Sequence, residues 1–173
     1  MAQTFTAYNS GVAFATSKVM GGIYNTHASE ILKIRRVGLL NGQTAAVTGV
    51  LCNLEMRLTT GTPTWTSPTA DVVTTHDSNN SAPSSYSHGN GGTFSGGTST
   101  ALRRTNWSSD EAAVSASTMD ELECFVPLNI IFDAGYGDAN VQPLTLRQNQ
   151  MAHVYNISGA AGLLDVWIEF TKE

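Results

Sequence analysis

Strict alternation of apolar and polar residues constrains the fold of this chain more than any other feature of its sequence. The clearest example lies near the C-terminus, where every second position is apolar: Leu164, Val166, Ile168 and Phe170. Successive side chains of a strand point to opposite faces, so this period of two predicts a half-buried strand. The same test predicts two more long strands, with apolar faces formed by Cys52, Leu54, Met56 and Leu58 and by Leu122, Cys124, Val126, Leu128, Ile130 and Phe132.

The alternation in residues 32–41 slips by one position, because Arg36 stands where an apolar residue is due. A β-bulge adds one residue to one strand of a pair and accounts for such a slip. The Asn41-Gly42 pair that follows tolerates the positive φ of a tight hairpin turn. We therefore expect residues 32–41 and 43–58 to be antiparallel neighbours.

Shorter segments with strand character are spread along the rest of the chain, whereas helical periodicity is scarce. These weaker strands are expected at residues 3–8, 12–16, 72–75, 100–105, 144–147 and 151–157. Residues 76–99 are dominated by Ser, Asn, Gly, Pro and Thr, which predicts one long, exposed and flexible loop. The pattern predicts an all-β fold: an antiparallel two-sheet sandwich of the jelly-roll type, with residues 1–173 as a single domain and residues 1–12 as an N-terminal arm.

The surface of such a domain carries few charges, because only 13% of the residues are Asp, Glu, Lys or Arg. The formal net charge of -5 disfavours nucleic acid and anionic lipid as partners, since both attract clustered Lys and Arg. No apolar run approaches the roughly 20 residues that span a bilayer, and the first residues lack the order of a signal peptide. We expect no nucleic-acid partner, no membrane and folding in a cytoplasm.

The histidines and cysteines do not form a recognised metal or catalytic motif. The His-x-His pair of metal-binding cupins is missing from the sequence, and its four histidines are scattered: His27, His76, His88 and His153. His153, three residues before Asn156, gives a faint echo of the later cupin motif, and a hydrogen-bonded or interface histidine is the alternative. Cys52 and Cys124 are expected to be two reduced, buried thiols, with a single bridge as the other interpretation.

The acidic and glycine-rich segments also lack the spacing that known chemistry requires. Acids at residues 110–111 and 120–123 fit a solvated strand edge more simply than a glycosidase pair. Residues 133–140 lack the ligand spacing of an EF-hand, and no glycine-rich phosphate loop occurs. We predict no enzyme activity, no catalytic residue, no cofactor and no bound metal.

Four stretches of the chain resemble a family of short proteins from tailed-phage genomes. They are residues 34–49 (IRRVGLLNGQTAAVTG), 102–111 (LRRTNWSSDE), 127–138 (PLNIIFDAGYGD) and 163–170 (LLDVWIEF). Similar small β-proteins in phages are capsid decoration or cement proteins, which bind the assembled shell and are commonly trimers. The resemblance therefore implies a virion structural protein on the capsid surface, with the major capsid protein and its own copies, as a homotrimer, for partners.

Residues that contact other chains are expected on the polar faces of the strands and in the N-terminal segment. A surface rich in Ser, Thr and Asn makes neutral hydrogen bonds without desolvating charges, and Trp167 on the polar face of its strand is a candidate anchor. The interface candidates are Phe5, Tyr8, Lys33, Arg35, Arg36, Arg57, Trp107 and Trp167. The N-terminal segment, residues 1–8, and the basic strand around Arg35 are expected to contact neighbouring chains, and the long loop is expected to project outward. The alternatives for these three segments are an edge strand, a solvated face and simple disorder, respectively.

Two other functions stay open at this point. The receptor- or glycan-binding head of a phage tail fibre needs exposed aromatic residues near acids, which Tyr86, Trp107 and Tyr136 would supply. A cupin-type enzyme needs a metal bound by His153. Fold class alone does not separate these functions from capsid decoration.

Overall fold

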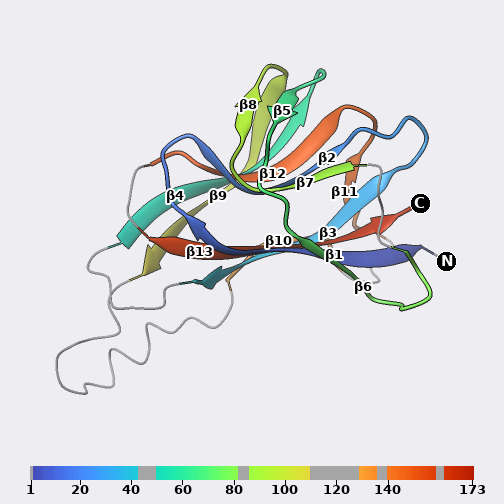
Figure 1. Cartoon of the computed structure of the whole chain (residues 1–173), viewed down its shortest axis with the longest axis horizontal. Coiled ribbons are helices and arrows are strands. Elements are labelled where there is room, and N and C mark those ends of the chain that lie inside the picture. The colour runs from blue at the N-terminus through green and yellow to red at the C-terminus, as the bar shows by residue number, and fades with distance from the viewer. Residues whose placement is uncertain (1, 43–49, 82–85, 110–128, 136–139, 159–161) are drawn as a thin grey trace.

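The computed structural model describes residues 2–42, 50–81, 86–109, 129–135, 140–158 and 162–173, which form two packed antiparallel sheets (Figure 1). The first sheet contains β1 (Gln3–Ala13), β3 (Leu32–Asn41), β6 (Val72–Thr75), β10 (Asn129–Asp133), β11 (Leu144–Leu146) and β13 (Leu163–Lys172). The second sheet contains β2 (Lys18–Asn25), β4 (Val50–Thr60), β7 (Tyr86–Gly89), β9 (Thr98–Ser109) and β12 (Gln150–Asn156). A separate two-stranded ribbon joins β5 (Thr64–Thr66) to β8 (Thr93–Ser95).

The strands of the two sheets pair in a nested order. β1 pairs with β13, β2 with β12, β3 with β10, and β4 with β9, always antiparallel. The first sheet therefore has the order β10-β3-β13-β1-β6, with β11 also beside β3, and the second has the order β7-β2-β12-β4-β9. This is the strand arrangement of a jelly roll, so the predicted all-β antiparallel sandwich is confirmed.

The hydrophobic core lies between the sheets and is formed by the inward faces of the alternating strands. All four apolar residues of the C-terminal pattern are fully buried, as are Cys52 and Leu54 on the facing strand β4. Phe5 of β1 stacks on Phe170 of β13 with 5.4 Å between ring centroids. Removing this apolar surface from water is the main source of stability for such a sandwich.

A β-bulge lies in β3 at the predicted position. Glu169 of β13 pairs with Arg36, and the next residue, Phe170, pairs with Ile34, so Arg35 is the extra residue. The Arg35 guanidinium bonds Thr171 and that of Arg36 bonds Asp133, partners on the outer side of the sheet. The bulge thus directs two consecutive arginines outward.

The predicted hairpin at Asn41-Gly42 does not form. β3 lies in the first sheet and β4 in the second, so residues 32–41 and the described part of 43–58 face each other across the core. The position beside β3 is filled by β13, which pairs with it over nine residue pairs. The local turn signal is overridden here by the packing of the two sheets. With β3 in one sheet and β4 in the other, the apolar faces of both strands are buried in the core between the sheets.

Two segments that were expected to be irregular belong to sheets. The prediction that residues 1–12 form an N-terminal arm is wrong, because most of them belong to β1, which lies in the first sheet between β13 and β6. The predicted loop, residues 76–99, contains β7, β8 and the start of β9. Its two large apolar residues anchor it: Tyr86 is buried in the main core, and Phe94 packs against a second cluster.

The predicted strand over residues 122–132 is described only from Asn129, and Cys124 lies outside the described residues. In the described part, Ile130 pairs with Gly38 and Phe132 with Val37, so Ile131 is an extra, bulged residue. Ile130 and Phe132 therefore lie on opposite faces, which corrects the expectation that they share one. No turn-forming residue marks this bulge in the sequence.

The β5–β8 ribbon covers the outer face of the second sheet (Figure 1). Trp65 and Phe94, which pair across the ribbon, pack with Val19, Tyr24 and Met151 in a small second core. The Trp65 indole Nε1 donates a hydrogen bond to the carbonyl of Gly91 at 2.8 Å. The second sheet is therefore buried on both sides over this area.

Candidate functional site

The outer face of the first sheet brings together five of the eight residues that were expected at an interface. They are Tyr8 on β1, Lys33, Arg35 and Arg36 on β3, and Trp167 on β13. These three strands are adjacent in the order β3-β13-β1. Because alternate residues of the same strands fill the core, these side chains point to the opposite side. We call this surface the first-sheet outer face.

An apolar row crosses the first-sheet outer face from one edge of the sheet to the other. Ile130, Gly38, Trp167, Tyr8 and Val72 are aligned by successive cross-strand pairs over β10, β3, β13, β1 and β6. Ile130, Tyr8 and Val72 are 41%, 37% and 66% exposed. They are three of the five large apolar residues that are exposed in the described segments, so exposed apolar surface is concentrated in this row.

The position of the Trp167 ring depends on the glycine opposite it. A Cβ atom added to Gly38 would lie 2.4 Å from the indole, closer than any real contact. The ring therefore lies directly over the backbone of β3. On its other side, Trp167 is paired with Tyr8 of β1. This packing holds a large aromatic surface on the sheet with little freedom to rotate.

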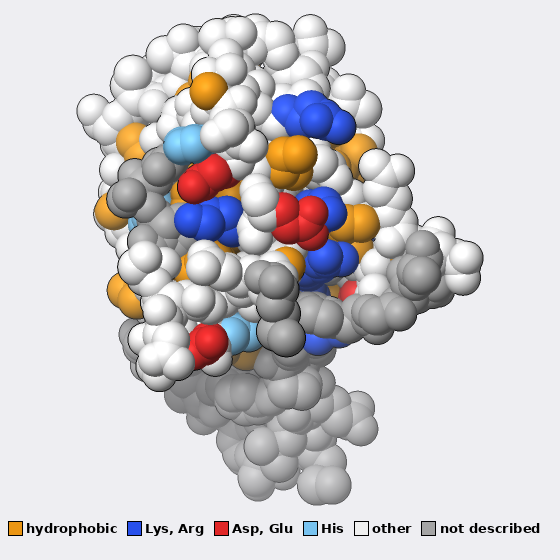
Figure 2. Space-filling view, turned by 90° about the vertical axis from the view of Figure 1, so that its right-hand side faces the viewer, with side chains coloured by type: hydrophobic (Ala, Val, Ile, Leu, Met, Phe, Trp, Pro, Cys, Tyr) orange, Lys and Arg blue, Asp and Glu red, His pale blue; other side chains and the backbone are white. Residues whose placement is uncertain are grey.

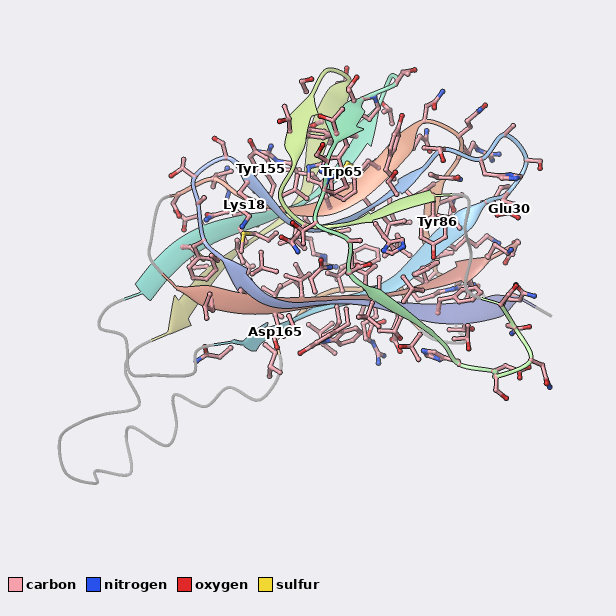
Figure 3. All side chains as sticks on the ribbon, viewed as in Figure 1. Lys18, Glu30, Trp65, Tyr86, Tyr155 and Asp165 are labelled. Carbon is pink, nitrogen blue, oxygen red and sulfur yellow. The ribbon has the colours of Figure 1, made fainter. Side chains whose placement is uncertain are left out.

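Tyr8 is fixed by a buried carboxylate. Its hydroxyl donates a hydrogen bond to Asp165 Oδ2, and the Gly11 amide donates to Asp165 Oδ1 at 2.6 Å. The hydrogen bond to Asp165, followed by burial, raises the pKa of Tyr8 to about 12. Tyr8 is therefore neutral and oriented at physiological pH. Figure 3 shows Asp165 projecting from the outer side of the first sheet.

A polar row with charges of both signs runs beside the apolar row, and one of its carboxylate oxygens, Glu169 Oε2, is buried without a hydrogen-bond partner among the described residues. The Arg36 guanidinium lies 3.0 Å from Asp133 Oδ2, and across the sheet Arg36 is paired with Glu169. Glu169 is paired in turn with Thr6, whose hydroxyl lies 2.8 Å from His76 Nε2. Half-exposed ion pairs of this kind contribute about 0–1 kcal/mol, so they orient side chains more than they stabilise the fold.

The end of the sandwich that carries both termini also mixes charges of both signs (Figure 2). Lys33 bonds the side chain of Glu173, and Lys172 Nζ lies 3.3 Å from Glu30 Oε1. Lys33 is therefore already paired within the chain, and the described residues at this end place charges of opposite sign side by side.

The three remaining interface candidates do not join the first-sheet outer face. Phe5 is fully buried in the core, where it stacks on Phe170, so its place at an interface is corrected. Arg57 lies on the outer face of the second sheet, 4.0 Å above the Tyr155 ring. The backbone of Trp107 is in β9, and its side chain lies outside the described residues.

His153, the residue of the cupin hypothesis, is buried beneath the ribbon. Its ring lies 5.0 Å from that of Phe94 and 5.9 Å from that of Tyr155, and neither ring nitrogen has a hydrogen-bond partner in the described structure. Burial, and secondarily the charge of Arg57, lowers the pKa of His153 to about 3. No group of three or more His, Cys, Asp or Glu side chains among the described residues is placed to hold a metal ion. His153 is thus a neutral packing residue.

A polar network joins the two sheets at the β6–β7 edge. The buried Asp71 carboxylate bonds His88 Nδ1 and accepts a hydrogen bond from Asn9 Nδ2 at 2.9 Å. Asn90 Nδ2 donates to Asn9 Oδ1 at 3.0 Å. An Asp–His pair orients a base in hydrolases, but no described serine, threonine or cysteine bonds His88. The network satisfies buried polar groups between the sheets.

The other residues considered for chemistry are buried, structural or outside the described segments. Cys52 is a free, buried thiol whose pKa burial raises to about 11. Tyr86, a candidate for glycan binding, is buried between the sheets (Figure 3), which corrects its expected exposure. Asp133 accepts a 2.8 Å hydrogen bond from the Gly135 amide and so closes a turn. Residues 110–111, 120–123 and Tyr136 lie outside the described residues.

The sequence interpretation missed Val72 and Ile130, the two ends of the apolar row. Val72 was expected in a strand, but its exposure depends on pairing with Tyr8 at the sheet edge. Ile130 was assigned to the apolar face, and only the bulge at Ile131 turns it outward. Neither position carries a local signal of its role.

Comparison of the chain with models of known protein families, with curated proteins and with solved structures gives no match. Within the described segments, no helix is long and apolar enough to cross a membrane.

Proposed function

We propose that this chain is a structural protein of a tailed-phage virion: a decoration or cement protein that binds the assembled capsid shell through the first-sheet outer face. The observation that carries the proposal is the apolar row, which presents oriented aromatic and aliphatic side chains that the described parts of the chain leave partly exposed. The resemblance of four stretches to tailed-phage proteins supports the viral context. The proposed partners are the major capsid protein and two further copies of the chain in a homotrimer.

The size of the first-sheet outer face suits a stable protein interface. Its five strands β1, β3, β13, β10 and β6 contain 11, 10, 10, 5 and 4 residues, and at about 3.3 Å per residue and about 4.8 Å per strand they cover roughly 630 Å². That approaches the roughly 800 Å² that each partner contributes to a standard interface. The face is therefore large enough for a specific protein contact.

The side chains of the apolar row are pre-organised for such contact. Trp167 is held over Gly38, and Tyr8 is held by Asp165, so little side-chain entropy is lost when a partner covers them. Aromatic residues in the centre of an interface commonly supply most of its binding energy. In the flanking polar row Arg36 is already paired with Asp133, so desolvating these two charges costs less than desolvating isolated charges.

Imaging of virions that contain this chain tests the proposal directly. The expected result is density for the sandwich in many symmetric copies on the shell, with the first-sheet outer face toward the capsid protein. Density confined to the tail tip would instead support the receptor- or glycan-binding head. Absence of the chain from the particle would refute a virion role.

A pair of variants tests the role of the face separately from the location of the protein. Val72→Glu places a charge at the end of the apolar row, and Val141→Glu places the same charge at an apolar residue outside the row that is 42% exposed. Rebinding to shells stripped of the protein should weaken at least tenfold for Val72→Glu, because burying an unpaired carboxylate costs more than about 1.4 kcal/mol. Val141→Glu should rebind normally, and equal behaviour of the two variants would contradict the assignment of this face.

A further inference from the structure

The outer edge of β9 has no strand partner among the described residues. β4 is its neighbour on one side, and β9 ends the order of the second sheet. The strand is 12 residues long, and its described side chains from Thr98 to Arg104 are all exposed. Unpaired N–H and C=O groups along such an edge are a template for an added strand. The edge is long enough to pair with an added strand of typical length, which is about 5–6 residues.

A small pocket opens beside this edge, between β9 and β10. It has a volume of about 190 Å³ and is lined by Met56, Arg103, Arg104, Thr105, Ile130 and Ile131. The apolar residues come from the sandwich interior and from β10, and the two arginines and the threonine come from β9. The pocket therefore combines an apolar floor with a basic rim.

The two arginines of the rim differ in what they bind. Arg104 Nε donates a 3.0 Å hydrogen bond to Glu55 Oε1, and that hydrogen bond is the main cause that lowers the pKa of Glu55. Arg103 has no hydrogen bond or ion pair to any residue that the structure describes. It pairs across the ladder with Met56, on the core-facing side of the sheet, which places its guanidinium at the pocket. Arg103 is thus the group of the pocket that remains available to an anion.

The charge of β9 indicates which kind of strand can be added. β9 contains two arginines and no acid, in a chain whose formal net charge is -5. A second copy pairing antiparallel through β9 would bring arginines against arginines, and like charges on facing strands are destabilising. An acidic segment of a different chain has the complementary charge, and a carboxylate accepts paired hydrogen bonds from a guanidinium.

We propose that β9 binds an extended, acidic segment of a partner protein as an additional strand, with one carboxylate of that segment in the pocket against Arg103. Main-chain hydrogen bonds along the edge supply affinity, and the pocket selects an acidic side chain. Ile130 ends the apolar row and also lines the pocket, so one partner can cover both surfaces. The inference does not depend on which protein covers the first-sheet outer face.

Two labelled peptides test this inference with the full chain. The probes are the capped peptides TVTVETVT and TVTVKTVT, with binding followed by fluorescence anisotropy and amide protection of β9 by hydrogen exchange. The glutamate peptide should bind at least tenfold more tightly than the lysine peptide and should slow exchange along β9. Arg103→Glu should reverse that preference, whereas the matched change Arg147→Glu, at an exposed arginine before β12, should leave it unchanged.

Equal binding of the two peptides, or a preference that survives Arg103→Glu, would overturn the proposal. Concentration-dependent dimerisation with β9 protected in the absence of peptide would also overturn it, because the edge would then be used by a second copy. Retention of the protein on virions is a separate readout, so failure here is distinguishable from failure of the decoration role.

Discussion

The two sheets of this sandwich treat their outer faces in opposite ways. On the second sheet, the β5–β8 ribbon covers Val19, Tyr24 and Met151 and seals His153 away from water. On the first sheet, the apolar row is exposed to solvent although it is held in place by Gly38 and Asp165. The described residues thus cover the outer face of the second sheet and leave the first-sheet outer face uncovered. An exposed apolar row of this kind is typical of an interaction site, and this is the face that we propose a partner covers.

The difference also shows why a buried side chain is weak evidence of function in this protein. Both ring nitrogens of His153 are buried without a hydrogen-bond partner among the described residues, and they lie under the ribbon, where packing explains their position. The candidate interface consists instead of common apolar residues that are exposed on the outer face of a sheet. Three predictions test whether the covered and uncovered faces differ as described.

The largest expected effect is acid destabilisation through the covered face. Because the pKa of folded His153 is lowered to about 3, the unfolded chain takes up a proton below its ordinary pKa of about 6.5 and the folded chain does not. Stability should therefore fall as the pH falls from about 6 to about 3, by about 1.4 kcal/mol per pH unit and roughly 4 kcal/mol in all. Urea unfolding at a series of pH values measures this slope.

Substitution of His153 isolates its share of the acid effect from that of the carboxylates. His153→Leu should flatten the slope and raise stability at pH 5, because it removes an unsatisfied buried group. An NMR titration in which His153 protonates near pH 6 would show that the ribbon does not seal this face.

The next effect is loss of the cover itself. Trp65→Ala should cost about 3 kcal/mol, because it removes the largest apolar side chain of the ribbon and leaves a cavity over the second sheet. Trp167→Ala should cost about 1 kcal/mol, since that ring packs on one side only. Denaturant unfolding of both variants measures the two losses of stability and so checks that the loss for Trp65→Ala is the larger. Equal costs would mean that the two tryptophans are equally covered, which contradicts the comparison.

The smallest effect concerns the order of the uncovered face. Gly38→Ala should displace the Trp167 ring and cost about 1–2 kcal/mol through overpacking. In a Trp167→Ala background the same substitution should be close to neutral, so a double-mutant cycle gives the coupling between the two positions. Tryptophan fluorescence reports the displacement independently. Additive effects would show that the indole does not lie over this glycine.

The sequence predicts strands and their inward faces well, because period-two burial is a local property. The strand around Phe170, the apolar face from Cys52 to Met56 and the bulge at Arg35 all follow from the pattern. Pairing is not local, so the hairpin at Asn41-Gly42 was wrong: β13 pairs with β3 instead.

The candidate site was predictable only where the residue type is unusual for its position. Trp167 on a polar face and consecutive arginines in a strand stand out, and both lie on the first-sheet outer face. Val72 and Ile130 are ordinary β-sheet residues, and they join the apolar row only through the edge position of β6 and the bulge at Ile131. Phe5 was misassigned because an N-terminal position suggested an arm, whereas its strand is central.

The nested pairing of the strands has a consequence for how the chain folds. Gln3 pairs with Lys172, so β1 can be paired with β13 only after the intervening strands of both sheets have been made. Contacts of such large sequence separation place all-β domains among the slow folders, on timescales of milliseconds to seconds. Until β13 is available, the edges of β1 and β3 that it pairs with are open to wrong pairing, which favours aggregation of partly folded chains.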